Sequence, residues 1–313
     1  MVIIRPDKFR VPWFRRFGIP AAAALAVLLA AAYFFSRPPA LVVSDAGFDF
    51  VYGFRRTLAG QIGLSLRLFR RVERVLIAEN ADPDALAFAI EEKEQRPWAV
   101  LGHSRYAWGL GQYARQREDV RVVVIGEDSE SSEPRPGPAA QGEAEFVFPD
   151  AGLNSWRLGR CAALLAGETA GIALVFQEQP NFPVRRDAFL AGLQEENENI
   201  VPYYLDSSSD YPSWDAVRCV VLAGPSESSF GGGREIPFLL YSWMDPALSP
   251  SSVKVVADDS PWALASGAFL APPGGGYRVF PAAFSIPWGR VGDSGLRKKL
   301  KKAISSQISQ VSL

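Results

Sequence analysis

The sequence predicts an α/β protein made of two lobes, each built around a parallel β-sheet. Short runs rich in Val, Ile and Leu recur along the chain and are apolar throughout, which is typical of strands buried on both faces. Segments of helical length separate these runs, as they do where helices connect parallel strands. The alternation runs to about residue 152 and then starts again. We therefore expect a first lobe over residues 40–152 and a second over residues 153–290.

The first lobe contains five expected strands and three expected helices. The strands are residues 41–45, 65–69, 98–102, 121–126 and 146–148, and the helices are residues 48–63, 82–95 and 105–117. Asp82 and Pro83 mark a helix start, because Asp caps free N–H groups and Pro carries no N–H that needs a partner. Residues 127–145 are rich in Ser, Pro, Gly and acidic residues and predict a flexible acidic loop.

The second lobe repeats the pattern and is followed by a basic tail. Its expected helices are residues 154–166 and 184–196, and its expected strands are residues 171–176, 201–205, 217–222, 237–241 and 253–256. Residues 291–313 predict a basic amphipathic helix, because apolar residues recur there at helical spacing with five Lys and Arg residues between them. Such a helix would either pack on its own lobe or lie on an anionic membrane surface.

A long apolar segment near the start of the chain predicts a membrane anchor. Five Lys and Arg residues precede an uncharged run from Phe17 to Phe35, which would span about 28 Å as a helix. We expect residues 1–16 to form a short cytoplasmic segment and residues 17–36 to cross the cell membrane once, with the bulk of the chain periplasmic. A cleaved signal peptide is the alternative, but the aromatic residues 33–35 continue the run and favour an uncleaved anchor.

Composition excludes several classes of function. After residue 40 the chain carries 27 Lys and Arg against 33 Asp and Glu, so nothing in its charge favours nucleic acid as a partner. Two cysteines and one histidine are too few for a Cys/His zinc site, and we expect neither a metal nor a cofactor. Cys161 and Cys219 lie in apolar segments, where they would either form a disulfide or remain two buried thiols.

Three local patterns resemble a known fold. Residues 171–175 followed by the Arg185–Leu193 segment, the strand and turn of residues 237–246, and residues 253–264 resemble the type I periplasmic-binding-protein fold. This fold, with two Rossmann-like lobes, is shared by sugar-binding transport receptors and the effector domains of LacI-type regulators. The resemblance covers roughly residues 40–290. Ala188 stands where the family has a glycine, and either Trp243 or Asp245 would occupy its acidic ligand position.

The resemblance implies a ligand site between the lobes, at the carboxyl ends of the strands. Reading those ends gives the candidate ligand residues Asp45, Phe48, Asp49, His103, Arg105, Asp150, Phe182, Arg185, Arg186, Trp243, Asp245 and Asp259. Aromatic rings with carboxylates and guanidinium groups suit a small polar ligand such as a sugar or nucleoside. Alternative roles remain: Asp45 as a helix N-cap, His103 as a structural residue, and the two arginines as solvent-facing residues.

Three functions follow from these expectations. The first is a membrane-tethered solute-binding protein that presents its ligand to a permease or another membrane protein. The second is an extracytoplasmic interaction module that has kept the fold and lost the ligand. The third, an enzyme, is disfavoured because the chain has one histidine and no Gly-x-Ser-x-Gly motif, so we expect no catalytic residues.

Overall fold

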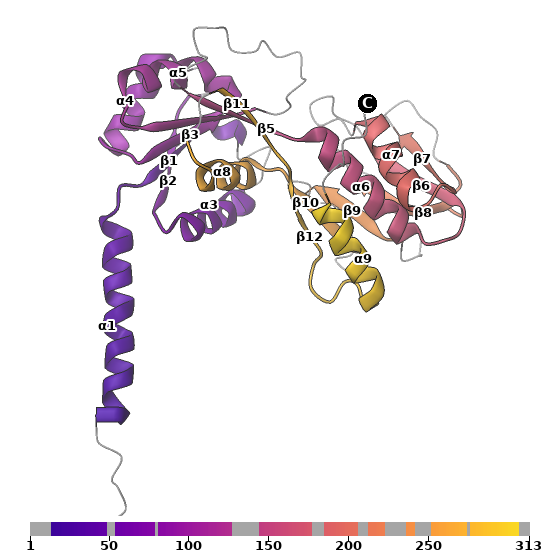
Figure 1. Ribbon diagram of the computed structural model, residues 1–313. Helices are drawn as coiled ribbons and strands as arrows, with labels where there is room; N and C mark the ends of the chain where they lie inside the picture. Colours follow the sequence, from indigo (N-terminus) through magenta and orange to yellow (C-terminus); the bar gives the residue numbers. More distant parts are fainter. Residues whose placement is uncertain are drawn as a thin grey trace, which may run out of the picture.

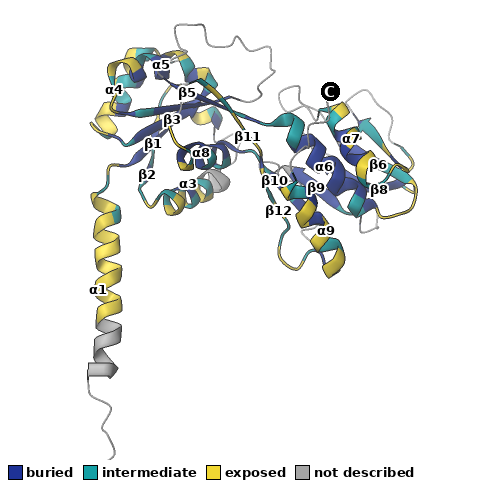
Figure 2. Ribbon diagram, viewed as in Figure 1, coloured by how far each residue is buried: buried dark blue, intermediate teal, exposed yellow. Residues whose placement is uncertain are grey.

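The structure is a computed structural model with two α/β lobes and one helix that projects away from them (Figure 1). It describes residues 14–48, 54–78, 81–126, 144–176, 185–205, 212–222, 236–241, 252–273 and 276–306. The projecting helix is α1 (Phe14–Ser36), and its described side chains are almost all exposed (Figure 2). Within these ranges, no helix has the combined length and hydropathy of a membrane span.

The first lobe is a six-stranded, fully parallel sheet with helices on both faces. Its strand order is β2-β1-β3-β4-β5-β11. The strands are β1 (Ala40–Ser44), β2 (Val72–Leu76), β3 (Ala99–His103), β4 (Arg121–Ile125), β5 (Glu145–Pro149) and β11 (Gly276–Phe280). The helices are α3 (Phe54–Leu68), α4 (Pro83–Lys93), the short η1 (Ser104–Tyr106), α5 (Ala107–Gln116) and α8 (Pro261–Leu270).

Alternate residues of the first sheet face two separate cores. Ala40 and Val42 pack with α3 and α8, whereas Leu41 and Val43 pack with α4 and α5. Successive side chains of a strand point to opposite faces, so a strand covered by helices on both sides is apolar at every position. This explains the uninterrupted apolar run by which β1 was predicted.

The second lobe repeats this strand topology, except for one antiparallel edge strand. Its strand order is β7-β6-β8-β9-β10-β12, and β12 runs antiparallel to β10. The strands are β6 (Gly171–Phe176), β7 (Ile200–Leu205), β8 (Val217–Leu222), β9 (Phe238–Tyr241), β10 (Val253–Asp258) and β12 (Ala283–Ser285). The helices are α6 (Ala151–Ala166), α7 (Arg186–Glu196) and α9 (Ser294–Ser305). Cys161 and Cys219 are free thiols in this core, and burial raises the pKa of each to about 12.

The chain passes between the lobes three times. The crossings follow β5, β10 and β11, at residue 150, residues 259–260 and residues 281–282. The expected division placed all of residues 153–290 in the second lobe, but α8 and β11 complete the first lobe instead. They do so because the apolar residues of α8, such as Trp262 and Leu264, fill the core beside α3, and β11 extends the sheet beyond β5.

Two further segments differ from or refine the expectations. The predicted strand at residues 65–69 is the end of α3, because Leu64 and Leu68 pack on the core at helical spacing; β2 begins at Val72. The basic helix α9 packs on its own lobe through Leu300 and Ala303, which are buried, while its lysines remain exposed. Of the predicted acidic loop at residues 127–145, residues 127–143 lie outside the described residues. Its last two residues are buried instead, and Glu145 begins β5.

Candidate functional site

The crossings bring the carboxyl ends of the two sheets together. Phe280 of β11 lies beside Pro149 of β5 at the carboxyl edge of the first sheet. Ala283 of β12 lies beside Asp258 of β10 at the carboxyl edge of the second. The chain between Phe280 and Ala283 spans at most about 11 Å, so the two edges are neighbours there. Ligands of open α/β sheets bind at the carboxyl ends of strands, which makes this the candidate site.

Hydrogen bonds tie the first and third crossings to each other. The N–H of Ala282 donates to Oδ1 of the buried Asn154 on α6 at 2.8 Å. The N–H of Asp150 donates to the carbonyl of Phe280 at 2.8 Å, and its Oδ1 accepts the N–H of Leu153 at 2.8 Å as the N-cap of α6. Asp150 therefore lies at the lobe junction. Asn154 was not predicted as a site residue. The feature of the sequence that could have identified it is an amide side chain near apolar residues early in the helix.

Asp45, at the end of β1, is the centre of a buried cluster in the first lobe. Its Oδ2 accepts a hydrogen bond from Nη1 of Arg105 at 3.0 Å and another from the hydroxyl of Tyr106. Its Oδ1 accepts the N–H of Phe48 at 2.8 Å, which is the hydrogen bond of the N-cap alternative. The structure thus brings together three of the predicted residues. Nothing in the sequence singled out Tyr106.

The electrostatics of this cluster keep Asp45 charged and Tyr106 neutral. Burial by itself raises the pKa of Asp45, but hydrogen bonds from Tyr106 and Phe48 and the charge of Arg105 together hold the pKa below its usual value. Burial and the Asp45 carboxylate raise the pKa of the Tyr106 hydroxyl. The side chain of Arg105 is 35% exposed, so its guanidinium is the charged group of the cluster that reaches solvent.

Two other candidates of the first lobe lie mostly inside it. His103 is buried, and its Nδ1 accepts the N–H of Arg105 at 3.2 Å, so the ring caps η1. The ring of Phe48 is buried against Trp262 of α8, edge to face, with centroids 6.1 Å apart. These side chains therefore shape the loops at the ends of β1 and β3 and position Arg105.

The candidates of the second lobe lie separately, at the start of α7 and in the second crossing. The N–H of Arg185 donates to Oγ of Ser155 on α6 at 2.8 Å. The guanidinium of Arg186 lies 4.6 Å from the centroid of the Tyr204 ring on β7. Asp259 is half-buried between β10 and α8. The remaining candidates lie outside the described residues; they are Asp49, Phe182, Trp243 and Asp245.

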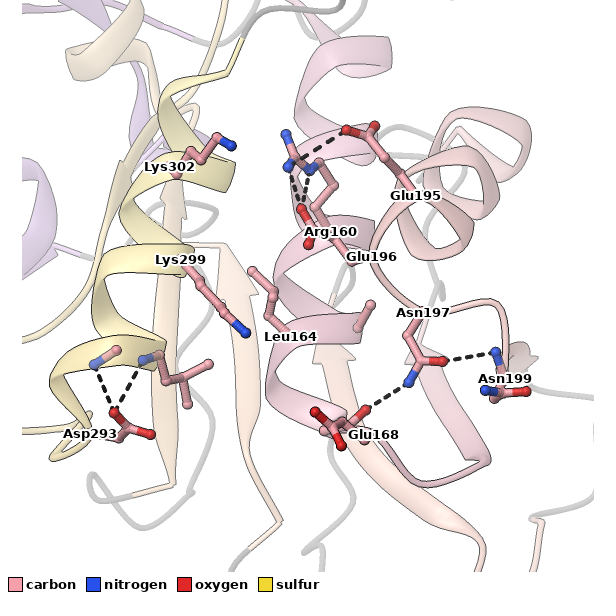
Figure 3. A pocket seen from close by; sticks show the side chains of 14 residues that line it. Arg160, Leu164, Glu168, Glu195, Glu196, Asn197, Asn199, Asp293, Lys299 and Lys302 are labelled. Atoms are coloured by element: carbon pink, nitrogen blue, oxygen red, sulfur yellow. Dashed lines mark hydrogen bonds and ion pairs between the residues drawn. The ribbon is translucent and has the colours of Figure 1, made fainter.

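A groove of about 890 Å³ lies on the outer surface of the second lobe, between α6, α7 and α9 (Figure 3). Arg160 on its floor is ion-paired with Glu196, with Nε and Oε1 2.8 Å apart, and with Glu195 at 3.6 Å. Lys299 and Lys302 of α9 line the other side. The charged groups of α6 and α7 are thus bound to each other, and none of the predicted ligand residues lines this groove.

Comparisons with known proteins identify the fold. No protein-family model matches this sequence, and a comparison with curated protein sequences finds no match. The structure is similar to a transcriptional activator of the comK gene from Bacillus halodurans, with a TM-score of 0.57 at 14% identity over 86% of this chain and 96% of that one. It is also similar to an ABC transporter solute-binding protein from Conexibacter woesei, with a TM-score of 0.55 at 14% identity over 85% and 94% of the two chains. At this identity the likeness concerns the fold, and it confirms that the two lobes have the type I periplasmic-binding-protein fold.

Proposed function

We propose that this protein is a membrane-attached solute-binding protein whose lobes close on a small polar ligand. The observation that carries the proposal is the arrangement of the crossings, which bring the carboxyl edges of the two sheets together. The fold is shared with a solute-binding protein of Conexibacter woesei, which supports the same function. A permease or another membrane protein would recognise the closed state.

A sugar or a nucleoside is the ligand class that the candidate residues favour. Arg105, fixed by Asp45 and partly exposed, offers guanidinium N–H groups to hydroxyl or carbonyl oxygens. Phe182 and Trp243, which lie outside the described residues, are proposed to stack on the apolar faces of a ring. The second lobe would add Arg185 at the start of α7.

The properties of α1 support attachment to the cell membrane. Its exposed large side chains, including Leu25, Leu28 and Phe35, are apolar. Almost all of its described residues are exposed (Figure 2). Attachment would keep the binding lobes close to a membrane partner and raise its effective concentration. The test is extraction of cell membranes at alkaline pH: retention of the full chain in the pellet supports attachment, and release into the supernatant argues for a free protein.

A ligandless interaction module is the second candidate, because the polar groups of the first lobe largely satisfy one another. Asp45 accepts bonds from Arg105, Tyr106 and Phe48, and the Phe48 ring is buried against Trp262. A module of this kind would keep the cluster as a structural element and bind a protein through its surface.

Thermal unfolding of the full chain in detergent, with sugars, nucleosides, polyols and amino acids added, separates the two candidates. A ligand of the folded state stabilises by about 2.7 kcal/mol at a hundredfold excess over its Kd. We expect a saturable rise in Tm with one ligand class, weakened in Arg105→Gln and Arg185→Gln. Arg117→Gln, which removes the partner of Asp119 on the surface, is the matched control and should bind normally. A flat screen on folded protein supports the ligandless module.

A further inference from the structure

The outer face of α3 carries an apolar stripe. Leu58, Ile62 and Leu66 follow one another at helical spacing, Phe69 comes directly after the helix, and these four residues are 42 to 70% exposed. The inner face of the helix is already in use, since Leu64 is buried in the lobe core and Gly60 lies against Trp262 of α8. A lobe helix normally turns a polar face to solvent. This one is apolar on both sides, and no described element covers its stripe.

The stripe continues directly into α1. The Tyr33 ring stacks on Phe69 with centroids 6.1 Å apart, and the Phe34 ring meets Phe69 edge to face at 5.7 Å. Figure 1 shows α1 leaving the first lobe on the side where α3 lies, and Figure 2 shows the described part of α1 almost entirely exposed and α3 exposed in part. The apolar side chains of α1 and the stripe therefore form one connected surface.

Two arginines border this surface at the point where α1 meets α3. Nη1 of Arg37 donates to the carbonyl of Phe69 at 3.2 Å, and its guanidinium lies 5.2 Å from the Tyr33 ring. Nη1 of Arg70 donates to the carbonyl of Pro38 at 3.1 Å, and its guanidinium lies 4.5 Å from the Trp98 ring. We call Tyr33, Phe34, Arg37, Phe69 and Arg70 the collar.

The positive charge of the collar is not neutralised locally. Neither Arg37 nor Arg70 forms an ion pair with a carboxylate in the part of the chain that the structure describes, and each keeps guanidinium N–H groups beyond those bonded to carbonyls. Burial and the nearby charge of Arg37 lower the pKa of Arg70. An anion with oxygen acceptors, such as a phosphate, would relieve this repulsion and take bidentate hydrogen bonds.

We propose that the collar and the α3 stripe form a membrane-facing surface, in which Arg37 and Arg70 bind the phosphates of anionic phospholipids. Aromatic and cationic side chains together are typical of the headgroup level of a bilayer, and an apolar helix face can lie in the same layer. This inference rests on the proposed attachment through α1. It would hold the first lobe against the membrane and leave the second lobe, which the crossings join to it, to move.

The test places a fluorophore on the stripe of the full chain reconstituted in lipid nanodiscs. Ile62→Cys provides the label site, since both native thiols are buried. Nanodiscs contain phosphatidylcholine alone or with phosphatidylglycerol, together with a lipid that carries a quencher in its headgroup. Phe88→Cys is the matched control, because Phe88 is 68% exposed on α4, which covers the opposite face of the sheet.

We expect quenching at position 62 to be at least twofold stronger with phosphatidylglycerol, and to fall to the neutral-lipid value in the Arg37→Gln, Arg70→Gln double variant. The comparison of lipids uses the native arginines, so it holds even if the double variant folds poorly. Equal quenching at positions 62 and 88 in loaded nanodiscs would overturn the proposal and leave the attachment intact. Failure of the chain to enter nanodiscs would overturn both the proposal and the attachment. If a second copy of the chain in the same disc shields position 62, the stripe is a surface for self-association and not for lipid, and the proposal is overturned.

Discussion

The two lobes share a topology but bury their charged groups in different places. In the first lobe the sheet carries them: Glu145 of β5 is buried and paired with Arg121 at 2.7 Å and with Arg278 of β11 at 2.6 Å. Arg121 also donates to the carbonyl of Ala268 at 2.7 Å and so holds the end of α8. Asp45 and its partners occupy the opposite edge of the same sheet.

In the second lobe, the buried polar residues instead lie on α6. Ser155 and Arg160 bind α7, through the N–H of Arg185 and the carboxylate of Glu196. Arg157 donates to the carbonyl of Ser306, just after α9, at 2.9 Å. Charges thus join strands in one lobe and helices in the other, which means that different elements should limit the stability of each.

Removal of the Glu145 charge should have the largest effect. Glu145→Gln leaves two guanidiniums facing each other without their carboxylate, and we expect the free energy of unfolding to fall by about 3 kcal/mol. Urea unfolding measures this loss, and hydrogen exchange should speed up in β4 and β5 but not in β8. Glu73→Gln, at a partly exposed ion pair of β2, is the control and should cost less than about 1 kcal/mol. Equal effects of the two substitutions would contradict the comparison.

Adding a methyl group between α6 and α7 should have the next largest effect on the free energy of unfolding. A Cβ on Gly192 would lie 2.1 Å from the carbonyl oxygen of Trp156, so the two helices could not keep their distance. We expect Gly192→Ala to lower the free energy of unfolding by about 2 kcal/mol. Gly63→Ala in α3 meets open space and should instead raise it, by up to about 1 kcal/mol. Thermal unfolding of both variants tests the sign, and a stabilised Gly192→Ala would refute close helix packing.

Asn154 tests the junction that both lobes share. Asn154→Ala removes the acceptor of the Ala282 N–H, and leaving that group without it should cost about 1–2 kcal/mol. The variant should also widen the distribution of lobe distances measured by spin-label pairs. Asn197→Ala, which loses an exposed bond to the Gly167 carbonyl, should leave that distribution unchanged. An unchanged distribution in the Asn154 variant would show that the crossings do not depend on this amide.

The smallest expected effect is the dependence of first-lobe stability on pH. The folded pKa of Asp45 is lowered, so its contribution is complete above the unfolded pKa near 3.8 and is lost as the pH falls through the lower folded value. The difference in unfolding free energy between the native chain and Asp45→Asn should therefore be constant from pH 7 to pH 5 and shrink below pH 4. Urea unfolding across this range measures it, and a difference that grows in acid would contradict the lowered pKa.

The sequence predicted the central parallel strands well because both-face burial leaves few polar positions in them. It missed the edge strands β2 and β11, which carry charged residues and are only partly buried. It misassigned residues 65–69, where polar Ser65 and Arg67 alternate with Leu66 and Leu68 as in a strand, although Leu64 and Leu68 pack on the core at helical spacing. The membership of α8 and β11 could not be read from sequence, because the sheet that an element joins is decided by distant pairing. For the same reason the link between Asp45 and Arg105, 60 residues apart, appeared only in the structure.

The three crossings also determine when each lobe is completed during synthesis on the ribosome. The first lobe lacks both its edge strand and the helix beside α3 until residue 280 has been made, after all the parallel strands of the second sheet. A nascent chain ending near residue 258 would expose the core face that Trp262, Leu264 and Phe269 later cover. The lobe that begins first is therefore completed late. Cutting the chain at a single point cannot separate a fragment that contains this lobe alone and complete.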